Sequence, residues 1–171
     1  GDHRDLHSFP TRRSSDLATI LFADIVGFTS KVERLEPGEL LATLDTFFQG
    51  FDKIVTKHKV RKIKTIGDAY MCVGGISEQR NSHAKKVCMA ALDMLRFVEA
   101  VNLQQEVLGK ESWELRIGIH SGALIAGTSG NAFDIWGDAV NIAARLESSS
   151  EPGKIHISEK TRDYLEGVGQ L

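Results

Sequence analysis

The feature that most constrains the fold is an almost unbroken apolar run, ATILFADI, at residues 18–25. A β-strand that carries apolar side chains on both faces is typical of a sheet that is covered on both sides. The run contains one charged residue, Asp24, next to its end. We therefore predict a strand at the centre of the core that ends at a carboxylate.

Helical and strand patterns alternate through the rest of the chain. Pro37 suits the first position of a helix, and apolar residues recur at helical spacing to about residue 58 and again over residues 84–98. Strands are predicted at residues 60–66, 69–75, 115–120, 122–128 and 154–158, and short helices at 139–148, capped by Asp138, and after Ser158. This order predicts an α+β sandwich with a ferredoxin-like βαββαβ core, a mixed, mainly antiparallel sheet and additional C-terminal α and β elements.

Length, charge and cysteine content narrow the class of protein. A chain of 171 residues favours one domain, and a net charge of −2 gives no indication of a nucleic-acid partner. No apolar run is long enough to predict a membrane segment in this sequence. Cys72 and Cys88 have neither metal-site nor disulfide spacing, so we expect buried free thiols and a cytoplasmic location. A membrane-anchored parent protein is compatible with this expectation.

The first 17 residues are expected to lie outside the fold. The stretch HSFPTRRSSDL, residues 7–17, resembles the in-frame translation of a sequencing adapter. Segments of this origin are set aside before the fold is considered. We therefore predict a non-native, disordered leader at residues 1–17 and one folded domain at residues 18–171.

Three motifs carry the residues suited to chemistry. In FDIWGDAVNIAARLE, residues 133–147, Asp134 precedes a tight turn, and Asn141 and Arg145 share one face of the predicted helix. A carboxylate, a carboxamide and a guanidinium together could bind a polar ligand and stabilise developing negative charge. The alternative is a surface helix in which Arg145 forms a salt bridge with Glu147 or Glu151.

The other two motifs, FADIVGFTS at residues 22–30 and KIKTIGDAYM at residues 62–71, each contribute an aspartate. Asp24 ends a strand and Asp68 lies in a turn, and two such carboxylates suit Mg²⁺, which prefers oxygen ligands. The alternative is a helix cap at Asp24 and an ordinary hairpin residue at Asp68. The backbone N–H groups of residues 27–29, entering a helix, could bind phosphates.

These three motifs, in this order, resemble the class III nucleotidyl cyclase catalytic domain, which forms cyclic AMP or cyclic GMP from a nucleoside triphosphate. The resemblance extends over about residues 18–171 and implies a phosphorus–oxygen lyase. It also implies two Mg²⁺ or Mn²⁺ ions bound by Asp24, Asp68 and the backbone carbonyl of Ile25. The residues that the resemblance assigns to phosphates are Gly27, Phe28, Thr29 and Arg116. It assigns the ribose to Asn141 and the charge of the transferring phosphoryl group to Arg145.

The resemblance also assigns the choice of purine to Lys64 and Asp134. Lys64 can only donate hydrogen bonds, and ionised Asp134 can only accept them. This pair matches the N1 acceptor and 6-amino donor of adenine and mismatches guanine, and guanylyl cyclases carry Glu and Cys at these positions. The sequence therefore predicts an adenylate cyclase that converts ATP to 3′,5′-cyclic AMP and pyrophosphate by attack of the ribose 3′-hydroxyl.

A second subunit is expected. If Lys64 and Asp68 lay on one strand, their side chains would point in one direction, although they serve opposite ends of ATP. The family resolves this with a head-to-tail homodimer that has two shared sites, and the chain carries both halves of a site. His120 and Trp136 are interpreted as packing or interface residues.

Three alternatives remain open. They are a guanylate cyclase, a catalytically silent cyclase-like domain that dimerises or senses nucleotides, and a diguanylate cyclase, whose GGDEF or GGEEF signature is absent. Residues 126–134 form a shorter segment than is usual in the family. The family pattern continues into a final hairpin with a phosphate-binding lysine, for which Lys154 and Lys160 are poor substitutes. We therefore expect a domain truncated at its C-terminus.

Overall fold

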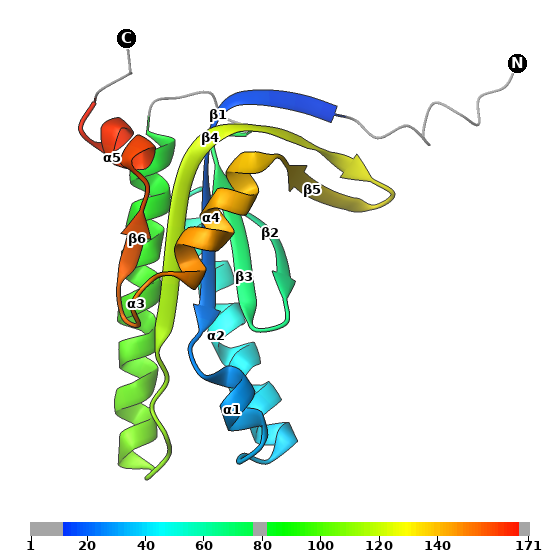
Figure 1. The fold of residues 1–171 in the computed structure, drawn as a ribbon. Helices are drawn as coiled ribbons and strands as arrows, with labels where there is room; N and C mark the ends of the chain where they lie inside the picture. Colours follow the sequence, from blue (N-terminus) through cyan, green and yellow to red (C-terminus); the bar gives the residue numbers. More distant parts are fainter. Residues whose placement is uncertain (1–11, 77–81, 168–171) are drawn as a thin grey trace, which may run out of the picture.

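The computed structural model describes residues 12–76 and 82–167 and places them in one layered fold (Figure 1). The elements, in chain order, are β1 (Arg12–Ile25), α1 (Phe28–Val32), α2 (Pro37–Lys57), β2 (Arg61–Ile66), β3 (Ala69–Gly74), α3 (His83–Val107), β4 (Leu115–Ser129), β5 (Ala132–Trp136), α4 (Asp138–Ser148), β6 (Ile155–Ile157) and α5 (Glu159–Leu165).

The sheet has the strand order β2-β3-β1-β4-β5, and β6 adds to β4. Only the β4–β6 pairing is parallel among the described strands, and the others are antiparallel. Helices α2 and α3 lie on one face of the sheet and α4 on the other (Figure 1). This arrangement confirms the predicted α+β class with a mixed, mainly antiparallel sheet.

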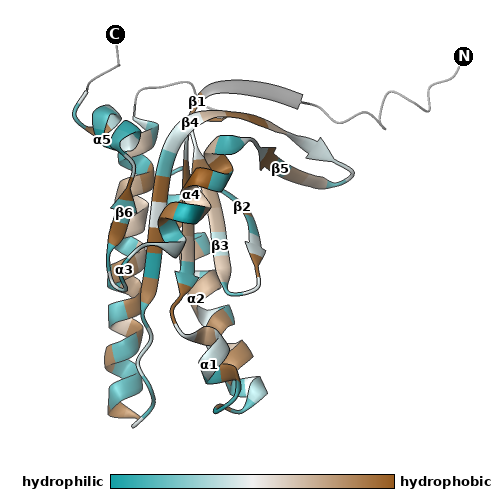
Figure 2. Ribbon diagram, in the orientation of Figure 1, coloured by the Kyte–Doolittle hydropathy of each residue, from teal (hydrophilic) through white to brown (hydrophobic). Residues whose placement is uncertain are grey.

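Strand β1 lies in the middle of the sheet and is buried on both faces, as its composition predicts. Leu21 and Ala23 pack into the core beneath α2 and α3, whereas Ile20 and Phe22 pack into the core beneath α4 and β5. All four are buried. The helices carry hydrophobic and hydrophilic residues in alternation, which is typical of helices with one face on a core (Figure 2).

Two strands extend further than predicted. The backbone of residues 12–17 continues β1, where residues 12–15 pair with residues 124–127 of β4 after a shift in register near Ser15. The backbone of residues 12–17 is therefore extended and not disordered as expected, and β4 supplies pairing partners for residues 12–15. Residues 1–11 lie outside the described part, and the non-native origin of the leader stays a prediction. Strand β4 is likewise continuous, because Ser121 and Gly122 stay paired with Thr19 and Ala18.

Several predicted element ends can be compared with the structure directly. Pro37 is the first residue of α2, and Ser158 caps α5, where its Oγ accepts a hydrogen bond from the Thr161 N–H at 3.2 Å. The predicted cap of α4 is displaced by one residue. Gly137 occupies the cap at φ 132°, and Asp138 is the first helical residue. Glycine tolerates this positive φ, whereas an aspartate at the same position would be strained.

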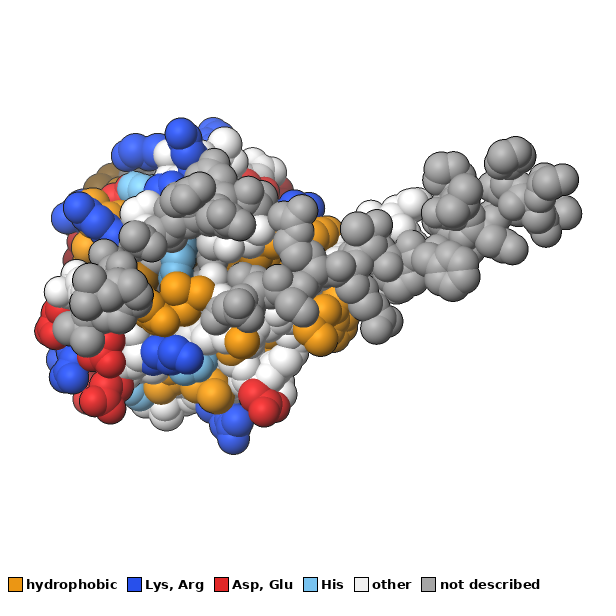
Figure 3. All heavy atoms as spheres, turned by 90° about the horizontal axis from the view of Figure 1, so that it is seen from above, with side chains coloured by type: hydrophobic (Ala, Val, Ile, Leu, Met, Phe, Trp, Pro, Cys, Tyr) orange, Lys and Arg blue, Asp and Glu red, His pale blue; other side chains and the backbone are white. Residues whose placement is uncertain are grey.

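The remaining general expectations concern thiols and surface. Cys72 is buried and Cys88 half-buried, both are unpaired, and burial raises the pKa of the Cys88 thiol to about 11. Within the described residues, no helix has the length and apolar character needed to cross a membrane. Seen from above in Figure 1, the surface mixes basic, acidic and hydrophobic side chains (Figure 3).

Candidate active site

The first group of site residues forms where β1 and β4 run side by side. Asp24 of β1 is in register with Arg116 of β4. The Arg116 Nε donates to Asp24 Oδ1 at 3.3 Å, and its Nη2 donates to Asp24 Oδ2 at 3.1 Å. The side chain of Asp24 is 16% exposed and that of Arg116 is 29% exposed. Backbone register therefore places an arginine directly against the carboxylate that ends the central strand.

Asp68 joins this group from the neighbouring turn. Residues 67–68 connect β2 and β3, Gly67 has a φ of 58°, and Ala69 is the register partner of Asp24. Burial raises the pKa of Asp68, and the negative charge of Asp24 raises it further. Two carboxylates that repel each other in this way form a site that a cation would stabilise.

Asp24 and Asp68 carry carboxylate oxygens, the type of ligand that Mg²⁺ and Mn²⁺ prefer. Among residues 12–76 and 82–167, no group of three or more His, Cys, Asp or Glu side chains is arranged to hold a metal. Asp24, Asp68 and the backbone carbonyl of Ile25, the last residue of β1, would thus supply a partial ligand set. Mg²⁺ commonly accepts such a set, because water and substrate phosphates fill its other positions.

Glu147 is a member of this group that the sequence analysis did not assign to the site. Its side chain is 8% exposed, and its Oε1 lies 3.7 Å from the Arg116 Nε. Burial raises the pKa of Glu147 to about 8, and a hydrogen bond with Asp24 and the charge of Asp24 act in the same direction. We call Asp24, Asp68, Arg116 and Glu147 the carboxylate cluster.

A sequence signal for Glu147 was present. Ala139, Ala143 and Glu147 follow at intervals of four residues and are the buried residues of α4. A glutamate on the buried stripe of a helix needs a polar or charged partner. The stripe predicts burial of Glu147, but only the packing of α4 on β4 identifies Arg116 as its partner.

Gly118 explains how α4 comes so close to the sheet. A Cβ atom at this position of β4 would lie 2.2 Å from the Glu147 backbone N and 2.8 Å from the Ala143 backbone O. No real side chain tolerates those separations from backbone atoms. The missing side chain therefore lets α4 rest directly on β4 and carries Glu147 into the cluster.

The predicted phosphate loop follows β1. Gly27, at φ 73°, occupies the cap position of the five-residue helix α1, and the Ser30 Oγ donates to the Gly27 carbonyl at 2.8 Å. Thr29 is exposed and Phe28 packs against the core beneath α2 and α3. The predicted phosphate loop thus starts at Gly27, three residues after Asp24 of the carboxylate cluster.

Asn141 and Arg145 are exposed on α4, one helical turn apart. The Arg145 Nε donates to the backbone carbonyl of Asn141 at 3.5 Å. The alternative of a structural salt bridge is not found, because Glu147 contacts Arg116 and Glu151 contacts Lys154 at 3.5 Å. Apart from the hydrogen bond between them, neither Asn141 nor Arg145 contacts a predicted site residue through a hydrogen bond or ion pair in the described part of the chain.

Lys64 and Asp134 meet at the far edges of the sheet. The Lys64 Nζ donates to Asp134 Oδ2 at 2.7 Å, and Asp134 Oδ1 accepts from the Ile135 backbone N–H at 2.8 Å. The two side chains are 46% and 21% exposed. We call Lys64 and Asp134 the selectivity pair, after the role that the sequence predicts for them. The short segment 126–134 still lets Asp134 reach Lys64, because it forms a β4–β5 hairpin with Gly127 opposite Asp134.

Lys64 and Asp68 do not lie on one strand, contrary to the prediction. Strand β2 ends at Ile66, and Asp68 lies in the following turn, so the alternation of a single strand does not relate the two side chains. The pairing of β2 with β3 also shifts at Ile63. The expectation of a shared site therefore rests on the family resemblance and on surface properties.

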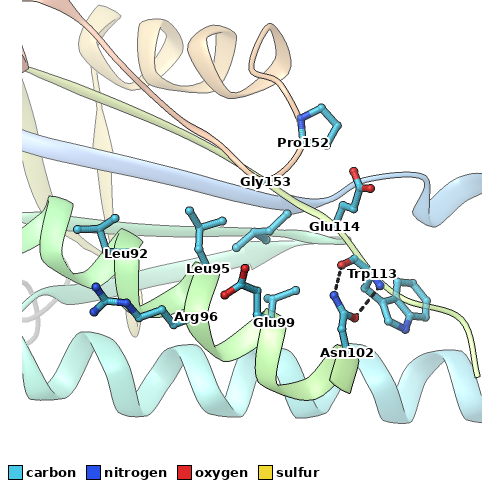
Figure 4. A pocket seen from close by; sticks show the side chains of 11 residues that line it. Leu92, Leu95, Arg96, Glu99, Asn102, Trp113, Glu114, Pro152 and Gly153 are labelled. Atoms are coloured by element: carbon cyan, nitrogen blue, oxygen red, sulfur yellow. Dashed lines mark hydrogen bonds between the residues drawn. The ribbon is translucent and has the colours of Figure 1, made fainter. Parts of the chain in front are cut away.

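Other features lie apart from these groups. The His120 Nδ1 is hydrogen-bonded to the Ser158 Oγ at 2.8 Å, and Trp136 is 40% exposed. A cavity of about 420 Å³ opens between α3 and the start of β4, where Asn102 is already hydrogen-bonded to the backbone of Trp113 (Figure 4). None of the predicted site residues lines this cavity.

Comparison with known proteins gives the family. Residues 11–170 match the family described as the adenylate and guanylate cyclase catalytic domain. The chain belongs to this cyclase family. It is 40% identical over 155 residues to the receptor-type guanylate cyclase gcy-28 of Caenorhabditis elegans, covering 89% of this chain and 12% of that protein. It is 37% identical over 153 residues to an adenylate cyclase of Mycobacterium tuberculosis, covering 88% of this chain and 34% of that protein.

Solved cyclase domains share the fold. The adenylyl cyclase CyaB from P. aeruginosa superposes with a TM-score of 0.84 at 30% identity, covering 94% of this chain and 84% of that chain. The dimeric guanylyl cyclase domain of RhoGC from Blastocladiella emersonii gives 0.82 at 34% identity, covering 91% and 86%. Similar proteins thus include adenylate and guanylate cyclases, so the family alone does not select the purine.

Proposed function

We propose that this cyclase domain is an adenylate cyclase that acts on ATP. The observation that carries the proposal is the selectivity pair, in which the Lys64 Nζ lies 2.7 Å from Asp134 Oδ2. The donor and the acceptor are close enough to meet the neighbouring N1 and 6-amino groups of adenine together. Guanine presents a donor to Lys64 and an acceptor to Asp134, and both contacts are then repulsive or unpaired.

The carboxylate cluster would bind the triphosphate end. Asp24, Asp68 and the Ile25 carbonyl would hold the metal ions, which when bound lower the pKa of the ribose 3′-hydroxyl and neutralise phosphate charge. Arg116, already oriented by Asp24, would bind the β-phosphate. The backbone N–H groups of residues 27–29 would bind phosphate oxygens at the start of α1.

The reaction that we infer is an internal displacement. The 3′-hydroxyl oxygen bonds to the α-phosphorus, the bond from that phosphorus to the bridging oxygen of pyrophosphate breaks, and the hydroxyl proton is lost. Asn141 would orient the ribose, and Arg145 would stabilise charge on the transferring phosphoryl group. The guanidinium of Arg145 is exposed and pairs with no carboxylate among the described residues, so it is available to a ligand.

We further propose a homodimer with two shared sites. Large apolar side chains are exposed on the strands of the pair and on β4, namely Ile66 of β2 at 54%, Ile125 of β4 at 44% and Trp136 of β5 at 40%. Ile125 and Trp136 are register partners on the β4–β5 hairpin. Neighbouring exposed apolar residues favour an interface between subunits, and a second copy would supply Asn141 and Arg145 to the carboxylate cluster.

The direct test exchanges the selectivity pair. The double variant Lys64→Glu, Asp134→Cys should lower turnover of ATP and raise relative use of GTP, by about tenfold or more per position, because each mispaired buried polar group costs about 1–3 kcal/mol. The measurement is kcat/KM for both triphosphates. Lys62→Gln, on the same strand but paired with Asp52, serves as the control.

The outcomes separate the alternatives. Preference of the wild type for GTP would identify a guanylate cyclase. Binding of nucleotide without turnover in the presence of Mg²⁺ or Mn²⁺ would identify a silent sensing domain. An ATP to GTP ratio that stays unchanged in the double variant would exclude the assigned role of Lys64 and Asp134.

A further inference from the structure

Strands β2 and β5 lie at opposite ends of the sheet order, yet their side chains touch. The β4–β5 hairpin bends across the sheet face, where Phe133 packs against the core beneath α4 together with Ile63 of β2. Two interactions then join the strands, namely the Lys64–Asp134 ion pair and a contact between Arg61 and Phe133. The selectivity pair therefore depends on how β5 is held over β2.

A shift in strand register decides which β2 side chains face β5. Lys62 pairs with Cys72 of β3, and Lys64 pairs with the next residue, Met71, so Ile63 is the extra residue of a β-bulge. Lys62 points towards α2, where its Nζ lies 3.0 Å from Asp52 Oδ1. Simple alternation would put Lys64 on that same face. The bulge instead places Lys64 on the face of Arg61 and Ile63, towards β5.

The contact of Arg61 with Phe133 is short and lies next to the selectivity pair. The Arg61 Cζ is 3.5 Å from the centre of the Phe133 ring, which is within the range of a cation–π interaction. Phe133 directly precedes Asp134, and Arg61 lies two residues before the bulge residue, Ile63. This contact therefore fixes the backbone of β5 beside β2 through groups that do not touch the base.

We propose that Arg61 is a positioning residue for purine selection and acts through Phe133. The proposal rests on the proposed function of Lys64 and Asp134. When a purine enters, these two side chains exchange part of their mutual ion pair for hydrogen bonds to the base. The Arg61–Phe133 contact then remains as the polar link between β2 and β5 and keeps the donor and acceptor at the spacing that distinguishes the two purines.

The test compares four variants of the whole chain. Arg61→Gln and Phe133→Leu should each reduce the ratio of kcat/KM for ATP to that for GTP by about two- to fivefold, the range of an exposed cation–π contact. Most of the change should appear in KM, because neither residue touches the reacting atoms. Arg61→Lys retains a cation and should keep most of the ratio, and Lys62→Gln should leave it unchanged. Thermal unfolding of each variant checks that the fold persists.

The outcomes distinguish this inference from the proposed function. If the wild type shows no turnover, the same ratio is measured as dissociation constants for ATP and GTP. If the wild type prefers GTP, the proposed function fails, but Arg61→Gln should still move the ratio towards one. Folded Arg61→Gln and Phe133→Leu variants with the wild-type ratio overturn the positioning role. Equal affinity of the wild type for both triphosphates overturns it as well.

Discussion

The carboxylate cluster and the selectivity pair occupy the same domain but are held by different means. Asp24 and Arg116 are paired by the register of two central strands, and Glu147 is carried in by a helix that rests on one of them. Lys64 and Asp134 come from strands at opposite ends of the sheet order and meet only through side chains. The first group is part of the core, and the second is an exposed contact.

This difference would separate the two roles that we propose, catalysis for the cluster and base selection for the pair. In the cluster, the side chains of Asp24 and Glu147 are 16% and 8% exposed, and burial together with the neighbouring Asp24 raises the pKa of Glu147. Lys64 is 46% exposed, and water weakens its ion pair with Asp134. We expect changes in the cluster to affect turnover and stability, and changes in the pair to alter the choice of base with little loss of fold.

The largest expected effect breaks the cluster and tests the shared site at the same time. Asp24→Ala and Arg145→Ala should each lower turnover by about a thousandfold or more. Mixing the two variants should restore about a quarter of wild-type activity, because about half of the dimers are then mixed and each has one intact site. Steady-state rates across the mixing ratio provide the measurement.

A site contained within one subunit would give a different result. Every site would then carry one defect, and activity would stay flat at all mixing ratios. Subunit exchange must be shown independently, for example with two affinity tags. Near wild-type turnover of Asp24→Ala at saturating Mg²⁺ and Mn²⁺ would contradict the metal assignment.

A smaller effect is expected when the packing behind the cluster is disturbed. Gly118→Ala should lower the free energy of unfolding by about 3 kcal/mol, because a Cβ there meets the backbone of α4 at 2.2 Å. Lys64→Ala, at the selectivity pair, should change it by less than about 1 kcal/mol, since exposed ion pairs contribute little. Urea unfolding of both variants measures the contrast. Equal losses would show that the two groups are held alike.

A further expected effect is a pH dependence that arises at Glu147. The pKa of this carboxyl is raised to about 8 in the folded protein from an ordinary value of 4.5. The folded state therefore holds a proton that the unfolded state has released, and stability falls as pH rises between these values. Glu147→Gln removes this loss, so its stability relative to wild type should increase with pH, by at most about 1.4 kcal/mol per pH unit.

Unfolding in metal-free buffer at about pH 5, 6.5 and 8 measures this difference. Because Asp68 also has a raised pKa, the quantity to follow is the difference between the variant and the wild type rather than either curve alone. A difference that is constant with pH would show that Glu147 ionises as an ordinary exposed glutamate. The carboxylate cluster would then resemble the selectivity pair more closely than its burial indicates.

Local patterns predicted much of the fold, and contacts between distant strands accounted for most of the errors. The composition of residues 18–25 correctly predicted a strand buried on both faces. Pro37 and Ser158 correctly marked the starts of helices, because their effect on the backbone is local. The break expected near Gly122 did not occur, since pairing with β1 stabilises an extended backbone there.

The same division applies to the candidate site. The motifs identified Asp24, Lys64 and Asp134, the family resemblance added Arg116, and the structure brings these residues together in two pairs. Their assigned roles stay predictions. Glu147 was passed over because a helical pattern shows that a residue is buried but not what it meets. The bulge at Ile63 likewise depends on pairing with β3, to which the β2 sequence alone gives no guide.

The sequence by itself determined the family, the alternation of elements and the chemical character of each site residue. These depend on the order of side chains and on interactions among near neighbours in the chain. Only the tertiary structure decided that Arg116 is shared by Asp24 and Glu147, and that Arg61 contacts Phe133. These contacts join residues from different strands and helices, so they exist only once sheet register, bulge and helix packing have placed those elements side by side.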